Sequence, residues 1–174
     1  MTNITGKKIL MIIARDKFRD EELFKPRDIL SAAGADITIA GSKVGTITGM
    51  LGGKAQATLN ITRAKPADYD AVIFVGGSGA SEYFNDPTAH KIATDSAAAG
   101  KVVAAICIAP SMLANAGLLK GKNATCYASE KSNLVAHQAN YTGKSVEVDG
   151  DIITADGPTS AEAFAQAILT ALRP

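Results

Sequence analysis

Short apolar runs and longer amphipathic stretches alternate along the chain. The runs are rich in Val and Ile and contain few polar residues, a pattern typical of strands that are buried on both faces of a sheet. The stretches between them repeat apolar residues at helical spacing. The clearest patterns predict strands at residues 8–14, 35–40, 71–75 and 101–106, and helices at residues 22–34, 87–99 and 159–172.

The remaining segments have weaker patterns. The pair Asp149-Gly150 lies between two alternating runs and is the strongest short-range hairpin signal in the chain. Residues 44–62 are rich in Gly and Thr and predict irregular β-structure, either a hairpin or edge strands. The other predicted elements are a loop at residues 15–21, a strand at 123–127 that carries Cys126, a helix at 129–137, and hairpin strands at 145–148 and 152–155.

Strands that alternate with helices predict a doubly wound α/β sandwich with a mostly parallel sheet and a small β-hairpin insertion. A chain of 174 residues fits a single domain, which we place at residues 1–174. In such a fold the loops that follow the first strand, the 71–75 strand and the 101–106 strand lie at one edge of the sheet. We therefore expect a ligand site where these three loops meet.

Cys107 lies where the 101–106 strand turns into a short helix that begins near Pro110. A side chain at this bend projects into the crevice of an open α/β sheet, as in a nucleophile elbow. The helix start would lower the pKa of the thiol and favour the reactive thiolate. A cysteine next to Val and Ile is equally typical of a packed core, so the elbow position alone leaves both interpretations open.

The glycines after the 71–75 strand are a second candidate feature. The run is Gly76-Gly77-Ser78-Gly79, and backbone amides in such a loop can approach a ligand closely enough to stabilise an oxyanion. A tight turn also accounts for a pair of glycines. The loop has no following Lys-Ser/Thr, so it does not predict a phosphate site, and no metal-ligand spacing is present. We expect no cofactor and no metal.

Charge and cysteine content narrow the class of protein. The formal net charge is +1 with both signs interspersed, which argues against nucleic acid or a membrane as partner. The polar segment 1–6 leads straight into a predicted strand and does not resemble a signal peptide, and no apolar run has membrane-spanning length. We expect a cytoplasmic protein whose two cysteines, Cys107 and Cys126, are thiols rather than a structural disulfide.

Several motifs together resemble the ThiJ/PfpI superfamily, also called the DJ-1/PfpI superfamily, which has a class I glutamine amidotransferase-like fold. Each motif is modest alone, but their order and spacing over nearly the whole chain are specific. They are Ala-Ala-Ile-Cys-Ile-Ala-Pro at residues 104–110, Phe-Val-Gly-Gly at 74–77, Phe-Arg-Asp-Glu-Glu-Leu at 18–23 with Pro26 after it, and the stretch from Asp149-Gly150 to Gly157-Pro158.

The resemblance implies a flavodoxin-like sandwich and a homodimer or higher oligomer. It implies that Cys107 is the nucleophile, that Glu22 is the carboxylate that bonds to its sulfur, and that the backbone N–H groups of Gly77 and Ile108 are oxyanion donors. A buried, protonated Glu22 would donate to a thiolate or a sulfinate, whereas an ionised Glu22 would act as a base and raise the pKa of the thiol. Glu22 is also compatible with a first-turn residue that favours the helix dipole.

Three positions depart from the family pattern. Ile108 stands where many members have a histidine after the nucleophile, so the usual Cys-His pair is absent and efficient peptide hydrolysis is poorly supported. Asp156 replaces a frequent arginine, which puts anion binding at that loop in doubt. Cys126 falls where members carry a histidine or a small residue, and it is either a second pocket thiol that pairs with Cys107 after oxidation or a buried strand residue.

Two classes of function follow. In the first, Cys107 adds to a small α-oxoaldehyde or to its adducts, Glu22 shuttles the proton, and a hydroxyacid is released, as in a glyoxalase or a deglycase. In the second, the chain is a non-enzymatic oxidative-stress sensor or chaperone that works through oxidation of Cys107. An intracellular cysteine protease is the weaker third interpretation because of Ile108.

Overall fold

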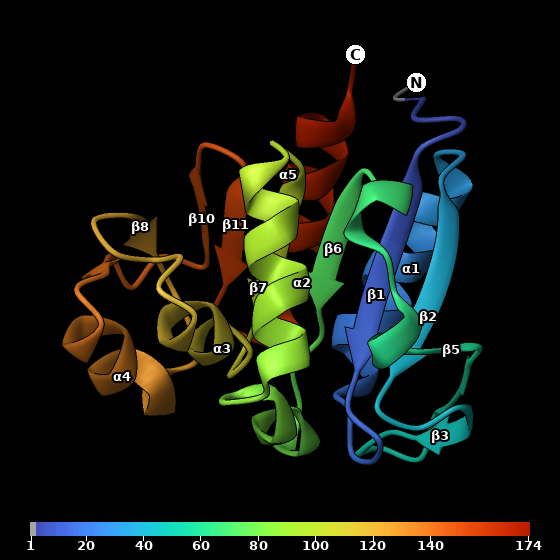
Figure 1. Cartoon of the computed structure of the whole chain (residues 1–174), viewed down its shortest axis with the longest axis horizontal. Helices are drawn as coiled ribbons and strands as arrows, with labels where there is room; N and C mark the ends of the chain where they lie inside the picture. Colours follow the sequence, from blue (N-terminus) through green and yellow to red (C-terminus); the bar gives the residue numbers. More distant parts are fainter. Residues whose placement is uncertain (1–2) are drawn as a thin grey trace.

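The computed structural model describes residues 3–174, so Met1 and Thr2, at the start of the predicted domain and of the polar segment 1–6, lie outside the described residues. A seven-stranded sheet runs through the molecule in the order β10-β11-β7-β6-β1-β2-β5 (Figure 1). Its strands are β1 Lys8–Ile13, β2 Asp36–Gly41, β5 Leu59–Asn60, β6 Ala71–Phe74, β7 Val102–Ile106, β10 Val146–Asp149 and β11 Ile152–Ala155. Every pair is parallel except the β10-β11 hairpin, which confirms the predicted fold.

Helices cover both faces of the sheet (Figure 1). The helices α1 (Asp20–Ala32) and α5 (Ala161–Leu172) pack together on one face, and α2 (Pro87–Ala98) and α3 (Pro110–Asn115) on the other. Because side chains alternate along a strand, β1 supplies both cores. Ile9, Met11 and Ile13 join the cluster on the α1 and α5 face, whereas Leu10 and Ile12 join the cluster on the α2 and α3 face.

The segment predicted as irregular β-structure forms a separate antiparallel hairpin of β3 (Gly45–Thr48) and β4 (Lys54–Ala57), followed by the short edge strand β5. The tip of this hairpin is held by Asp20, whose carboxylate accepts hydrogen bonds from the backbone N–H groups of Leu51 (2.9 Å) and Gly53 (2.7 Å). Asp20 is 8% exposed, so these bonds satisfy a largely buried charge. The hairpin is thereby fixed beside the start of α1.

Several predicted boundaries are wrong. The helix α1 begins at Asp20, so the end of the predicted loop 15–21 is helical, because acidic residues are favourable in a first turn. The strand predicted at 123–127 is confined to β8 (Asn123–Ala124), which pairs with β9 (Asn140–Tyr141), and Cys126 lies beyond it. Between them, α4 (Lys131–Ala136) follows a 3₁₀ turn and is shorter than predicted. No helix in residues 3–174 is both long and apolar enough to cross a membrane.

Candidate active site

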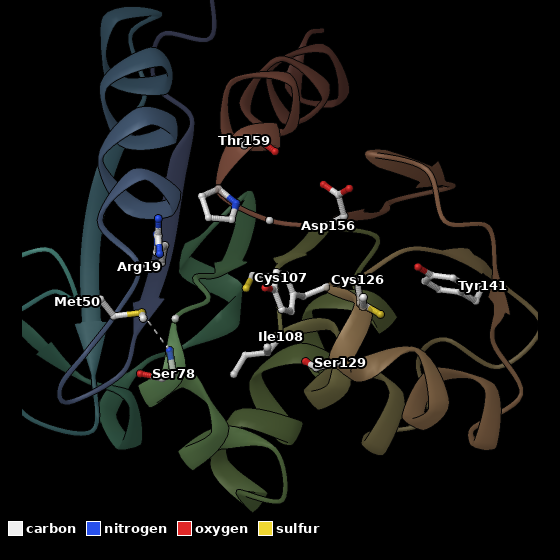
Figure 2. Close-up of a pocket in the computed structure, with 15 residues that line it drawn as sticks. Arg19, Met50, Ser78, Cys107, Ile108, Cys126, Ser129, Tyr141, Asp156 and Thr159 are labelled. Atoms are coloured by element: carbon white, nitrogen blue, oxygen red, sulfur yellow. Dashed lines mark hydrogen bonds between the residues drawn. The ribbon is translucent and has the colours of Figure 1, made fainter.

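The loops after β1, β6 and β7 meet at one edge of the sheet, as the alternation of strands and helices predicts. A cavity of about 630 Å³ opens there (Figure 2). Its wall is formed by residues from the start of α1, the tip of the β3-β4 hairpin, the β6 and β7 loops, the segment after β8 and the segment after β11. The lining residues are Arg19, Met50, Gly77, Ser78, Cys107, Ile108, Cys126, Tyr127, Ala128, Ser129, Tyr141, Asp156, Gly157, Pro158 and Thr159.

Cys107 lies at the bend between β7 and α3. Its φ of 65° falls in the left-handed region, which is unfavourable for a residue with a side chain and is typical of strained functional positions. The N–H of Cys107 donates to the carbonyl of Ala155 (3.0 Å), and its own carbonyl accepts from the N–H of Tyr127 (2.8 Å). Both neighbouring segments therefore hold the bend in place, and the residue is 8% exposed at the cavity wall.

Two glycines after β6 allow the site to be this compact. A Cβ at Gly76 would overlap a carboxyl oxygen of Glu22 and the Cβ of Cys107. Gly77 has a φ of 106°, and a Cβ there would overlap the backbone of residues 17–19. The glycine pair is therefore more than a tight turn, because it brings the backbone against both candidate catalytic side chains.

Glu22 lies on the first turn of α1 and is fully buried at 0% exposure. Neither carboxyl oxygen has a partner that meets the geometry of an ordinary hydrogen bond, although the group interacts with the thiol of Cys107 and the N–H of Gly76. Burial, the largest cause, raises the pKa of Glu22 to about 8. At neutral pH the carboxyl group is therefore largely protonated and can donate a hydrogen bond toward the sulfur.

The environment of the Cys107 thiol differs from the prediction. The backbone N–H groups of Gly77 and Ile108 do lower its pKa, and both are the donors that the family resemblance implies. Burial and the charge of ionised Glu22 outweigh them and raise the pKa of Cys107 to about 12. The prediction of a lowered pKa is wrong because it counted the helix start, in a helix of six residues, and not the desolvation of the bend.

Cys126 lines the same cavity, but its surroundings are different. It is 1% exposed and packs in the core on the α2 and α3 face, whereas Cys107 belongs to the core on the α1 and α5 face. The two sulfur atoms point in different directions (Figure 2), so a disulfide between them requires a side-chain rotation. Burial, followed by the charges of Glu130 and Asp156, raises the pKa of Cys126 to about 12.

The sequence patterns do not indicate several residues of the wall. Met50 arrives at the cavity on the tip of the β3-β4 hairpin, where its sulfur accepts a hydrogen bond from the N–H of Ser78 (3.4 Å). Tyr127 and Tyr141 come from the irregular segment around β8 and β9, which carries no strong periodicity. Arg19 is a charged residue of the wall that the sequence patterns also do not indicate. Its Nε (2.7 Å) and Nη2 (3.3 Å) donate hydrogen bonds to the carboxylate of Glu21.

Neither histidine lines the cavity. The ring of His90 contacts the carbonyl of Phe84 (2.8 Å), and the ring of His137 contacts the carbonyl of Asn133 (2.9 Å). Within residues 3–174 there is also no cluster of three or more His, Cys, Asp or Glu side chains suited to a metal ion. The reactive group at the wall that lies against a second titratable side chain is the thiol of Cys107, with the buried Glu22 behind it.

Comparison with known proteins places this chain in a family. The model of the DJ-1/PfpI family matches residues 7–171. An uncharacterised protein of Methanocaldococcus jannaschii is 38% identical over 98% of this chain and 84% of its own length. A deglycase of Pyrococcus horikoshii is 30% identical over 95% of this chain and 99% of its own length. The solved structure of a ThiJ/PfpI domain protein of Brachyspira murdochii is 34% identical, with a TM-score of 0.93 over 96% of this chain and 98% of that one.

Proposed function

Because the chain belongs to the DJ-1/PfpI family, we propose that it is a cysteine-dependent enzyme that acts on small reactive aldehydes or their adducts, of the glyoxalase or deglycase type. One observation carries the proposal: a fully buried carboxyl group lies against a thiol that stands at the wall of a cavity. The volume of about 630 Å³ is within the usual range of small-molecule sites. It leaves room for an aldehyde that is still attached to an amine.

The reaction begins with addition of the Cys107 sulfur to the aldehyde carbon. The S–C bond forms as the C=O double bond opens, and the thiol proton passes through Glu22 to the new hydroxyl oxygen. The N–H groups of Gly77 and Ile108, which face the sulfur, stabilise the charge that develops on that oxygen. A group whose pKa is about 8 is suited to both giving and taking a proton near neutral pH.

With methylglyoxal, Glu22 then moves a proton from the former aldehyde carbon to the neighbouring carbonyl carbon, and the proton of the new hydroxyl group passes to the oxygen of that carbonyl. The first carbon is oxidised to a thioester and the second is reduced to an alcohol, so no external oxidant or reductant is needed. Water hydrolyses the thioester and releases lactate and the free thiol. The net reaction is methylglyoxal plus water to lactate.

The test is release of lactate from methylglyoxal by the intact protein. We expect Cys107→Ser to lower the rate by at least about 10³-fold, because the nucleophile is lost, and Glu22→Gln to lower it by about 10²-fold or more. Cys126→Ser is the matched control, a second cavity thiol that keeps the rate within about threefold. A wild-type protein that produces no more lactate than Cys107→Ser overturns the proposal.

One observation favours a second candidate, an oxidative-stress sensor. The protonated Glu22 carboxyl has no conventional hydrogen-bond partner, and an oxygen added to the Cys107 sulfur would supply one. If this candidate is correct, mild peroxide adds two oxygen atoms to Cys107, and Glu22→Gln changes the yield of that oxidised form, while no lactate is formed.

A protease is less well supported, because no histidine lines the cavity. The homodimer and the cytoplasmic location stay predictions.

A further inference from the structure

Asp156 places a carboxylate at the cavity wall, directly after β11. One oxygen accepts a hydrogen bond from the hydroxyl of Ser160 (2.5 Å). Among residues 3–174, no lysine, arginine or histidine forms an ion pair with it. The carbonyl of the preceding residue, Ala155, accepts a hydrogen bond from the N–H of Cys107 (3.0 Å). Asp156 is therefore the next residue along the chain after a direct backbone contact of the nucleophile.

The other charges of the site are compensated. Arg19, on the opposite side of the cavity in Figure 2, is bonded through two nitrogens to the carboxylate of Glu21. Glu22 is largely uncharged near neutral pH. Of the described residues that line the cavity, Arg19 and Asp156 are the only ones with an acidic or basic side chain other than the cysteine thiols and the tyrosine hydroxyls. Asp156 therefore gives the wall an unpaired negative charge.

The negative charge of Asp156 acts on Cys126, another residue of the cavity wall. The charge of Asp156 is one of the causes that raise the pKa of Cys126, together with burial and the charge of Glu130. Neither Glu130 nor Lys131, whose ammonium lies 5.3 Å from the ring centre of Tyr141, lines the cavity. A ligand in the cavity thus meets a wall that includes the Asp156 carboxylate, whereas these two opposite charges lie outside the lining.

We propose that Asp156 is a specificity-determining residue that makes the cavity favour carbonyl substrates that carry a separate positively charged group, such as an ammonium or a guanidinium group, over anionic ones such as glyoxylate. The inference rests on the proposed function in that the substrate reacts at Cys107. The inference adds to that function the charge that a preferred substrate carries. A purely structural role, in which Asp156 only holds Ser160 at the start of α5, predicts no charge discrimination.

The experiment measures the rate of modification of Cys107 by two methanethiosulfonate reagents of similar size, one with a trimethylammonium group and one with a sulfonate group. The modified residue is assigned by peptide mass, because Cys126 lines the same cavity. The ratio of the two rates is insensitive to the thiolate fraction, which is common to both reagents. We expect the cationic reagent to react faster in the wild type at low ionic strength, and Asp156→Asn to lower the ratio by about tenfold.

Three controls keep the charge separate from the fold. Asp156→Glu retains the charge and should retain the ratio, Asp156→Arg should invert it, and Ser160→Ala removes the hydrogen bond but should leave the ratio in place. The rate with glyoxylate relative to methylglyoxal should rise in Asp156→Asn. A ratio that is unchanged by Asp156→Asn, or that falls equally in Ser160→Ala, overturns the inference. The reagents need no turnover, so a missing lactate signal counts against the proposed function and not against the charge selection.

Discussion

The cavity has a cysteine on each of two walls, and the surroundings of these two cysteines differ. At Cys107 the backbone is strained at a φ of 65°, two N–H groups face the sulfur, and a buried carboxyl group lies against it. Cys126 has no positive φ and no buried carboxyl contact, and its sulfur points elsewhere (Figure 2). Both thiols have a pKa raised by burial to about 12. What distinguishes the candidate nucleophile is therefore the group that supplies and removes its proton, and not its intrinsic acidity.

The largest expected effect is the change with pH that Glu22 causes in the free energy of unfolding. The pKa of Glu22 is about 8 in the folded chain and 4.5 ordinarily. Between these values the folded protein holds a proton that the unfolded chain has released, so the stabilisation is complete below the lower value and is lost as pH rises toward the upper one. We expect the free energy of unfolding of the wild type to fall by a few kcal/mol (~1.4 per pH unit at most) relative to Glu22→Gln over this window, measured by urea denaturation.

The neighbouring residue provides a matched control for this pH dependence. The hydrogen bond to Arg19 lowers the pKa of Glu21, so its contribution is present above the ordinary value of 4.5 and is lost only below it. Glu21→Gln should therefore show the same slope as the wild type through the window of Glu22. If Glu22→Gln also keeps the wild-type slope, the carboxyl group is not protonated in the folded protein.

A smaller effect separates the two thiols by their reactivity. Above pH 8, Glu22 is ionised and opposes formation of the Cys107 thiolate. Alkylation of Cys107 in Glu22→Gln should then be about tenfold faster than in the wild type, whereas near pH 6 the difference should be small. The rate at Cys126, followed in the same sample by peptide mass, should not change. An equal response of both thiols would mean that the coupling is not specific to the Glu22 contact.

The smallest expected effect tests the backbone alone. Cys107→Gly should be more stable than Cys107→Ala by roughly 0.5–1 kcal/mol, because glycine relieves the unfavourable positive φ. At Cys126, which has no positive φ, glycine should instead be less stable than alanine by a similar amount. Thermal or urea denaturation of the four variants measures both differences. The same sign at both positions would show that the bend at Cys107 is not strained.

The two walls also differ in how much the sequence revealed. The buried strands, the hairpin at Asp149-Gly150 and the bend at Cys107 depend on local patterns, and the structure confirms these elements. The wall around Cys126 is built from two-residue strands and single helical turns, whose positions depend on contacts between distant loops. Periodicity therefore extended the strand at 123–127 too far and gave no signal for Tyr141.

The sequence also predicts the pKa values of Cys107 and Glu22 only in part. The sequence indicates that a helix begins near Cys107, which favours a thiolate, but it does not show that the bend is enclosed. Desolvation depends on the packing of residues from separate elements, and it outweighs the amides. For Glu22 both protonation states were open, and it is the complete burial of α1 at this position that favours the neutral one.

The first turn of α1 has a further consequence for how this chain can vary. Within four residues, the N–H of Arg19 donates to the carbonyl of Gly76 (2.9 Å), Asp20 holds the hairpin tip, and Glu22 reaches Cys107. One amino acid inserted between Asp20 and Glu22 would rotate the carboxyl group of Glu22 by about 100° about the helix axis relative to Arg19 and Asp20, and the three connections would no longer form together. The spacing of these three residues in the first turn is thus constrained by contacts to three separate segments.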